Sequence, residues 1–307
     1  METLFANKIL FGEDVLGVLH LSAGRWLDYA MVVVTAGGSE LFYTILLPVL
    51  YWCWDRKRSL QLGVVFLVSM ALNNHLKYFY NHPRPDPAAM APLLGDLARM
   101  NMPPDPGFPS GHAQGAVSFW GPLMILARNR YVSMISVLML ILIPYSRIYL
   151  GVHFLGDIAG GYIIGLICLS ALLPAVMFAE REYRPGSIII IMALVLVPVM
   201  IYSLAPAESR INTTMGVLSG SLIGAYLGWE KIAFNPRNRL PYQLAKIGIG
   251  LPLMLLLRIG LKKIMPANPA AGFLVYWFLG YWYTFVIPYI FALIRPLRGD
   301  VEGSGPE

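Results

Sequence analysis

Apolar stretches of about 20 residues follow one another along most of this chain. An α-helix of that length crosses the roughly 30 Å hydrocarbon core of a membrane, because it rises about 1.5 Å per residue. Only 13% of the residues are charged and 57% are hydrophobic, whereas a soluble domain carries about 25% charged residues. The sequence therefore predicts an all-α, polytopic membrane helical bundle. It excludes a cytosolic enzyme, a disulfide-stapled secreted module and a disordered protein.

The pattern predicts about nine spans. They lie near residues 39–55, 59–80, 112–128, 131–149, 153–179, 187–205, 211–228, 243–264 and 272–294. The first 38 residues lack the basic start of a cleavable signal and are interrupted by charges, so we expect a short interfacial helix there. We interpret residues 1–307 as a single integral membrane domain. In it, residues 39–205 form a six-span core and residues 206–307 add about three C-terminal spans.

Basic residues between the spans predict the orientation of the chain. The side reached after the first span collects thirteen of the 23 lysines and arginines: Arg56, Lys57, Arg58, Arg128, Arg130, Arg181, Arg184, Lys231, Arg237, Arg239, Lys246, Arg295 and Arg298. Basic loops mark the cytoplasmic side of a membrane protein, so the opposite side faces away from the cytoplasm. Because the cations lie between apolar runs, the net charge of +6 reflects membrane topology, and we expect no nucleic-acid partner.

Most of the unusual polar residues occur in three segments that reach the non-cytoplasmic side. These are residues 77–85 at the end of the second span, residues 109–112 at the start of the third, and residues 146–157 between the fourth and fifth. Any one of them has a simpler interpretation, such as a lysine that snorkels to the interface or a helix-packing glycine. Their convergence on one membrane face favours a functional site.

The basic residues of this set indicate an anionic ligand. Lys77, Arg84 and Arg147 place three cations where burial is expensive, and both kinds of side chain suit phosphate oxygens. Ser110 and Gly111 directly precede a predicted helix, whose first amides form a natural anion site. We therefore predict that these five residues bind a phosphate group.

The histidines supply the chemistry. His153 and Asp157 are four residues apart at a helix start, so the carboxylate is expected to hold one ring nitrogen and leave the other free to attack phosphorus. His112 is placed to protonate the leaving oxygen and then to activate water. A structural His–Asp helix pair is the alternative interpretation. The predicted phosphohistidine mechanism uses no metal or other cofactor.

The spacing of these residues resembles the three-part signature of the type 2 phosphatidic acid phosphatase (PAP2) superfamily, in its integral membrane lipid phosphatase branch. Every specified position matches: Lys77, Arg84, Pro85, Pro109, Ser110, Gly111, His112, Ser146, Arg147, His153 and Asp157. The resemblance covers only residues 77–157. It implies a six-span core and a metal-independent, phosphohistidine-forming phosphatase. For the membrane members it also implies a lipid phosphate or diphosphate substrate, such as phosphatidic acid or an isoprenoid or sphingoid phosphate.

Three other functions are compatible with parts of this pattern. A lipid phosphotransferase on the same scaffold is the main alternative, because the motifs do not distinguish water from a lipid acceptor. The superfamily also includes soluble vanadium haloperoxidases, which are a weaker alternative because a chain this apolar presents its site at a lipid interface. A transporter or scramblase would spread its polar residues through the membrane depth instead of gathering them at one face.

Two features lie outside the signature. Glycines recur every fourth residue from Gly216 to Gly228, a stripe that lets helices approach closely; we expect packing within the chain, with a homo-oligomer seam as the alternative. Arg258, Lys262 and Lys263 cluster near the non-cytoplasmic end of the eighth predicted span. Snorkelling is the simpler interpretation of this cluster, and a second anion site is the alternative.

Overall fold

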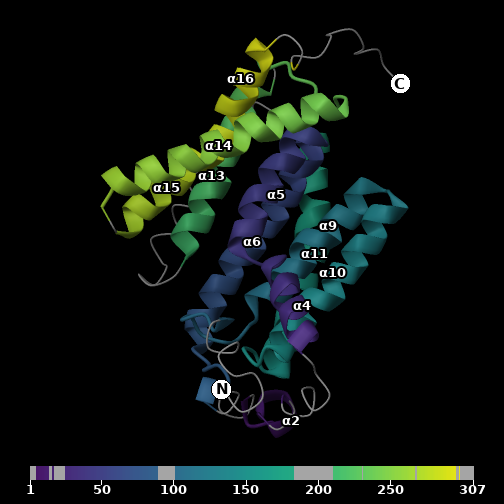
Figure 1. Ribbon diagram of the computed structural model, residues 1–307, viewed down its shortest axis with the longest axis vertical. Helices are drawn as coiled ribbons and strands as arrows, with labels where there is room; N and C mark the ends of the chain where they lie inside the picture. Colours follow the sequence, from purple (N-terminus) through teal and green to yellow (C-terminus); the bar gives the residue numbers. More distant parts are fainter. Residues whose placement is uncertain are drawn as a thin grey trace. The chain divides into compact units, whose positions relative to one another are not determined.

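A computed structural model describes residues 5–13, 16, 25–88, 101–182, 210–229, 231–266, 268–294 and 297. Throughout these residues the regular secondary structure is helical, which confirms the predicted all-α class (Figure 1). The helices are α2 (Lys8–Phe11), α4 (Arg25–Ala36), α5 (Glu40–Cys53), α6 (Arg56–Tyr80), α9 (Gly111–Ala127), α10 (Arg130–Tyr149), α11 (Leu155–Glu182), α13 (Ile211–Gly228), α14 (Leu240–Ile264), α15 (Pro269–Tyr281), the π-helix η1 (Trp282–Val286) and α16 (Ile287–Leu293).

Helices occupy eight of the nine predicted spans. The remaining span, predicted near residues 187–205, lies outside the described residues. Within the described ranges, five helical stretches are long and apolar enough to cross a membrane: Arg56–Tyr80, Arg130–Tyr149, Leu155–Phe178, Leu240–Ile264 and Pro269–Leu293. The pair Trp26–Ala36 and Glu40–Cys53 passes the same test together but is bent by 52°, as in a broken span or a re-entrant loop. The protein is thus a multi-span integral membrane protein.

The chain divides into two compact units. The first comprises Met1–Tyr43 and Ser69–Pro174, and the second comprises Thr44–Val68 and Ala175–Glu307. The boundaries fall inside α5, α6 and α11. All three polar segments singled out in the sequence lie in the first unit, so the candidate site is contained in a single unit.

Helices α9, α10 and α11 lie side by side in the first unit (Figure 1). Small residues set the distance between α11 and α9. A Cβ added at Gly161 would lie 2.6 Å from the Ser110 carbonyl oxygen, and one at Gly165 would lie 2.9 Å from the Val117 Cβ. Since real Cβ atoms do not approach so closely, these glycines are what lets the start of α11 pack against the start of α9.

Helix α4 packs on α10 in the same unit. The Tyr149 hydroxyl donates a 2.7 Å hydrogen bond to Asp28, and Met31 is buried against Tyr149, Leu150 and Val152. The described part of the first 38 residues therefore contains a helix that is packed on the bundle and leads toward the polar segments. Its interfacial position stays a prediction.

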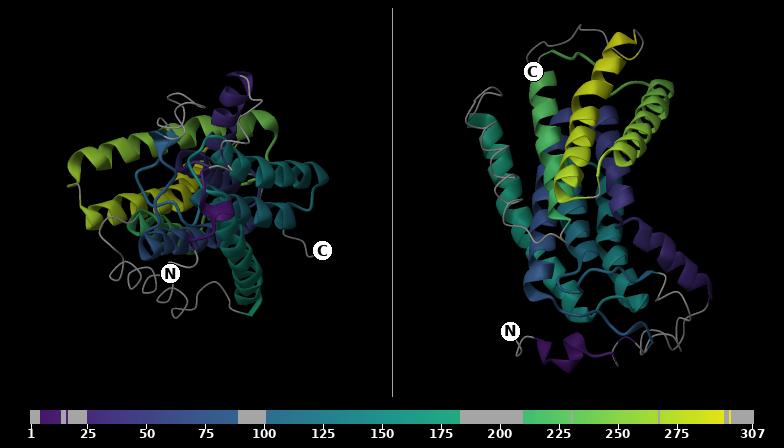
Figure 2. Two further views of the ribbon diagram at one scale, coloured as in Figure 1. Left: turned by 90° about the horizontal axis from the view of Figure 1, so that it is seen from below. Right: turned by 90° about the vertical axis from the view of Figure 1, so that its left-hand side faces the viewer.

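In the second unit α13 packs against α15 and η1 (Figure 2). The glycine stripe of α13 faces these helices. A Cβ at Gly216 would meet the Phe273 backbone, and one at Gly220 would meet the Trp277 backbone. From the other side, a Cβ at Gly280 would lie 2.7 Å from the Ser221 amide. The stripe is used for packing within the chain, which is the interpretation that we favoured from the sequence.

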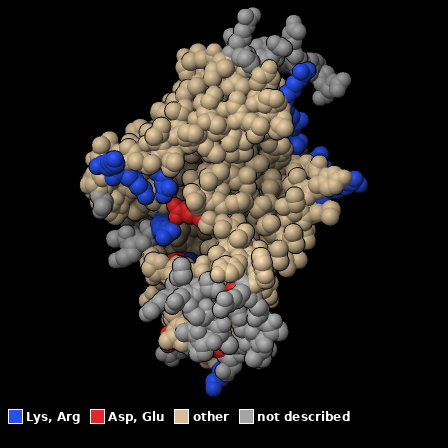
Figure 3. Space-filling model, in the orientation of Figure 1, with Lys and Arg blue, Asp and Glu red and all other residues tan. Residues whose placement is uncertain are grey.

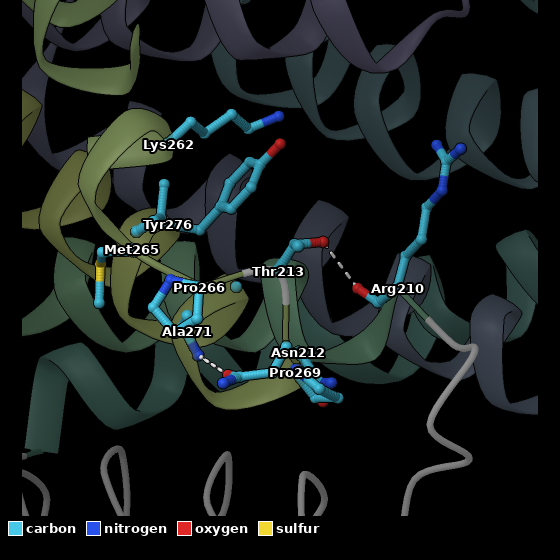
Figure 4. A pocket seen from close by; sticks show the side chains of 12 residues that line it. Arg210, Asn212, Thr213, Lys262, Met265, Pro266, Pro269, Ala271 and Tyr276 are labelled. Carbon is cyan, nitrogen blue, oxygen red and sulfur yellow. Dashed lines mark hydrogen bonds between the residues drawn. The ribbon is translucent and has the colours of Figure 1, made fainter. Parts of the chain in front are cut away.

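The basic cluster of α14 borders a cavity in the second unit. Arg210, before α13, and Lys262, near the end of α14, line this space of about 500 Å³ together with Tyr276 (Figure 4). On the face shown in Figure 3, lysine and arginine side chains gather over the connection from α14 to α15, beside a largely uncharged surface. This arrangement fits cations that mark the end of an apolar helix.

Candidate active site

The first unit brings the three polar segments together. Lys77 lies in the last turn of α6, and Arg84 follows in the extended segment 81–86. Ser110 caps α9, and Arg147 lies in the last turn of α10. Asp157 lies in the first turn of α11. Each polar segment is thus at a helix end, where the backbone groups that the helix itself leaves unpaired are available.

His153 and Asp157 form the pair that their spacing predicts. Asp157 Oδ2 lies 3.1 Å from His153 Nδ1 and accepts a 3.0 Å bond from the Phe154 amide. Both side chains are buried, with exposed fractions of 2% and 0%. This contact assigns the proton of the neutral ring to Nδ1 and leaves the lone pair on Nε2.

Arg84 lies against the free nitrogen of that ring. Its Nη1 lies 2.8 Å from His153 Nε2 and also donates a 2.9 Å bond to the Val152 carbonyl. Its Nε donates a 2.7 Å bond to the Asp105 carbonyl, and Nη2 donates to the Pro106 carbonyl at 3.3 Å. The guanidinium is therefore fixed mainly by backbone carbonyls, with one edge toward the ring of His153.

Lys77 approaches the same place from α6. Its side chain is 4% exposed, and Nζ donates to the Pro106 carbonyl and, at 3.5 Å, to the Gly107 carbonyl. An acidic residue that the sequence analysis missed completes the contact: Asp105 Oδ2 lies 3.0 Å from Lys77 Nζ, and its Oδ1 lies 3.2 Å from Arg84 Nη2. The sequence analysis did not predict a carboxylate between two cations that are themselves predicted to bind phosphate.

Ser110 acts chiefly through its backbone and its cap. Its Oγ accepts the Ala113 amide at 3.4 Å, while its own amide donates a 2.9 Å bond to the Asp157 carbonyl. Because that amide is already used, the first two amides of α9, at Gly111 and His112, are the better candidates for anion binding. Ser110 thus connects the start of α9 to the start of α11.

Arg147 and His112 meet at α4. Arg147 is 2% exposed, and its Nη1 donates a 2.8 Å bond to Thr35 Oγ1. Its Nε and Nη2 have no hydrogen-bond partner within the described part of the chain. His112 hydrogen-bonds to the Thr35 backbone. Two buried guanidinium donors without a partner in the described residues indicate that this place suits an anionic ligand, because leaving such donors unpaired is expensive.

The charges of these groups act on one another. The pKa of His153 is held well below its ordinary value, first by burial and then by the positive charges of Arg84, Lys77 and Arg147. Burial alone would raise the pKa of Asp105, but Lys77 and Arg84 outweigh it and keep that pKa below its usual range. The site therefore contains the neutral ring of His153, three cations and the ionised carboxylate of Asp105.

A buried amide network supports the loop before α9. Asn73 Nδ2 donates to the Pro109 carbonyl at 3.2 Å and to Gln114 Oε1 at 2.8 Å, and Gln114 Nε2 donates to the Ser69 carbonyl at 2.7 Å. Asn73 and Gln114 are 1% and 0% exposed. The sequence carried a signal for both, since amides inside apolar helices are rare and need partners.

Replacing Asn73 with leucine is expected to destabilise the first unit. The change leaves the Pro109 carbonyl and Gln114 Oε1 buried without this donor, which costs about 1 to 3 kcal/mol of unfolding free energy. Thermal unfolding of the purified protein in detergent measures the effect. Asn74→Leu is the matched control, because within the described residues Asn74 donates only to the Met70 carbonyl of its own helix. Equal unfolding temperatures for the two variants would contradict the proposed support.

Two family models match the chain. Residues 58–182 match the model of the PAP2 superfamily, and residues 212–298 match the model described as PAP2 superfamily phosphatase, transmembrane extension. The first region contains every site residue that the sequence predicts and Asp105, whereas Thr35 lies before it. The second region contains α14 to α16 and all of α13 except its first residue, Ile211. The two matches thus account separately for the site and for the C-terminal helices.

Individual relatives are phosphatases of phosphorylated lipids. The chain is 24% identical over 290 residues to sphingosine-1-phosphate phosphatase 2 of Mus musculus, covering 85% of this chain and 78% of that protein. It is 29% identical over 164 residues to phosphatidylglycerophosphatase B of Bacillus subtilis, covering 50% and 70%. A crystal structure of a transmembrane PAP2 type phosphatidylglycerolphosphate phosphatase from Bacillus subtilis is similar with a TM-score of 0.43 and 24% identity, covering 56% of this chain and 87% of that one.

Proposed function

The chain belongs to the PAP2 superfamily, and from this premise we propose that it is a lipid phosphatase that hydrolyses a lipid phosphomonoester or diphosphate through a phosphohistidine. The observation that carries the proposal is the environment of His153. Its Nδ1 is held by Asp157, and its Nε2 lies at the edge of a guanidinium, within the field of three cations. A neutral ring with a directed lone pair beside an anion site is arranged for attack on phosphorus.

In the first step Nε2 of His153 attacks phosphorus and the bond from phosphorus to the lipid oxygen breaks. Arg84 Nη1, which now lies against Nε2, moves to a phosphate oxygen as the substrate enters. The bond electrons stay on the lipid oxygen, which takes a proton from His112. His112 enters this step as an imidazolium, whose charge the bound phosphate dianion stabilises. Asp157 stabilises the positive charge that develops on the ring through its contact with Nδ1.

In the second step water attacks the phosphohistidine. His112, neutral after the first step, accepts the proton of the water as the new phosphorus–oxygen bond forms. The phosphorus–nitrogen bond breaks, its electrons return to Nε2, and inorganic phosphate leaves. Lys77, Arg84, Arg147 and the amides of Gly111 and His112 stabilise the charge on the transferring group in both steps.

The relatives suggest which lipid to test first. The similarity to the mouse sphingosine-1-phosphate phosphatase extends over 85% of this chain, whereas the similarity to the bacterial phosphatidylglycerophosphatase covers 50%. A sphingoid phosphate is therefore our first candidate, followed by phosphatidic acid, phosphatidylglycerophosphate and isoprenoid mono- and diphosphates. The head group that the cations bind is common to all of them, so the choice rests on the tail.

The decisive assay is phosphate release by the purified protein from this lipid panel, with a metal chelator present. Release of phosphate to water is expected for at least one lipid. A strict requirement for added metal would contradict the mechanism. Transfer of labelled phosphate to an added acceptor lipid instead of water would identify a lipid phosphotransferase.

The pH dependence follows from the pKa of His153. Because that pKa is depressed, the ring is neutral at neutral pH and stays so as the pH falls past the ordinary histidine value of about 6.5. The acid limb of kcat/KM, which reports the free enzyme, is expected below that value. The pH profile is measured with two substrates whose phosphate pKa values differ. A limb that belongs to the enzyme stays at the same pH for both substrates, whereas a limb that belongs to the substrate shifts. A shared limb at or above about 6.5 would contradict the assignment.

We also propose that the site opens to the non-cytoplasmic face of the cell or inner membrane. The support is the excess of basic residues in the opposite loops. The orientation can be tested by fusing, after residue 90, a reporter enzyme that is active only outside the cytoplasm. We expect this fusion to be active. A cytoplasmic reporter at this position would reverse the orientation and leave the chemistry unchanged.

A further inference from the structure

We propose that Asp105 is a resident counter-anion that competes with phosphate for Lys77 and Arg84 and so sets how tightly the site retains inorganic phosphate. The inference rests on the proposed function in that it takes phosphate as the ligand of these two cations. Asp105 lies in the segment that leads to α9, outside the signature that the sequence displays. It is the one described carboxylate that bridges Lys77 and Arg84.

The geometry places the carboxylate where phosphate oxygens are expected. One oxygen lies 3.0 Å from Lys77 Nζ and the other 3.2 Å from Arg84 Nη2. A bound phosphate would use the same two donors. A phosphate oxygen and a carboxylate oxygen cannot occupy the same position beside one donor. Bound phosphate and the present position of Asp105 therefore exclude each other at these two donors.

The two cations do not need the carboxylate to stay in place. Arg84 is held by the carbonyls of Asp105, Pro106 and Val152, and Lys77 by those of Pro106 and Gly107. All five bonds go to the backbone and survive a change of the Asp105 side chain. What the carboxylate supplies beyond them is negative charge, which lowers the attraction of the site for a phosphate dianion.

A path for displacement is also present. The Asp105 side chain is 26% exposed, whereas those of Lys77 and Arg84 are 4% and 8% exposed. The buried donors of Arg147 that lack a partner remain available to a first phosphate oxygen. Phosphate that binds there turns the carboxylate toward solvent, and the return of the carboxylate helps to expel the phosphate product.

The test is equilibrium binding of inorganic phosphate to the purified full-length protein in detergent, measured by calorimetry without lipid. Asp105→Asn keeps the shape of the side chain and removes its charge. We expect the Kd for phosphate to fall on the order of tenfold, a moderate change because the carboxylate is partly screened by solvent. Inhibition by phosphate should tighten in parallel, and Asp105→Glu, which keeps the charge, should stay close to the parent protein.

Asp86→Asn is the matched control, because it makes the same change of charge in the same region at an exposed residue. Among the described residues its carboxylate accepts only the Ala88 amide. An unchanged or higher Kd for Asp105→Asn would overturn the inference. If Asp105→Asn and Asp105→Ser both fail to fold, the carboxylate is structural and the inference is also overturned. Tighter phosphate binding in a protein that hydrolyses no lipid phosphate would retain this inference and refute the proposed function.

Discussion

Replacing His153 with alanine is expected to reduce phosphate release by a factor on the order of 10³ or more, because it removes the atom that we propose forms the covalent intermediate. In the structure His153 is 1% exposed and lies in the turn before α11. Its ring touches Asp157 on one side and Arg84 on the other. The residual rate would come from the cations and helix-end amides, which still bind and polarise the phosphate.

The measurement is designed to separate loss of the nucleophile from loss of the fold. His75→Ala is the control, because His75 is exposed on α6 and outside the site. It should keep the parent rate, and both variants should unfold near the parent temperature. Brief reaction with phosphorus-labelled lipid followed by denaturation should trap an acid-labile phosphoprotein in the parent and none in His153→Ala. Labelling or near-parent activity in that variant would remove His153 as the nucleophile.

Replacing Arg84 with lysine is expected to lower kcat/KM by about 10²-fold, although the charge is kept. The guanidinium uses all three of its nitrogens at once, to three backbone carbonyls, to Asp105 and to His153 Nε2. A single ammonium group cannot repeat that fork. It would leave carbonyls such as that of Val152 without a donor and would present only one point charge to the phosphate.

Arg130→Lys is the control for this substitution, since Arg130 is exposed and, within the described residues, its guanidinium interacts with the neighbouring Tyr131 and with no site residue. It should leave kcat/KM unchanged. For Arg84→Lys we expect both a lower kcat and a higher KM. The reason is that, in the proposed mechanism, the arginine acts both in binding phosphate and in stabilising the transferring group. If Arg84→Lys were as active as Arg130→Lys, the planar guanidinium of Arg84 would contribute no more than its charge, which would contradict the prediction.

Much of the candidate site could be predicted from the sequence because its members are tied to local geometry. His153 and Asp157 are four residues apart, so the helix that starts at Leu155 brings them into contact. Ser110 precedes a helix and caps it, as serine before an apolar run commonly does. The glycine stripe of α13 indicated close packing, although its partner, α15, could not be inferred from the stripe.

Other parts of the site could not be predicted in this way. Asp105 lies among prolines with no spacing that relates it to Lys77, and Thr35 belongs to a segment that we expected to be interfacial. The anion site also changed in detail. The Ser110 amide is bonded to the Asp157 carbonyl, which moves the expected phosphate contacts to the next two amides.

The amino-acid sequence was sufficient to identify lipid as the solvent and helices as the fold class, and it predicts a kind of chemistry. An apolar chain in lipid must pair its backbone groups within helices, and the few charges left at one membrane face indicated a phosphate. The tertiary structure alone decided which groups meet. It set Arg84 against the nitrogen of His153 that we propose as the nucleophile, left two donors of Arg147 without a partner among the described residues, and put Asp105 between two cations. The physical reason is that these contacts join segments distant in sequence, whose approach depends on helix packing and not on residue spacing.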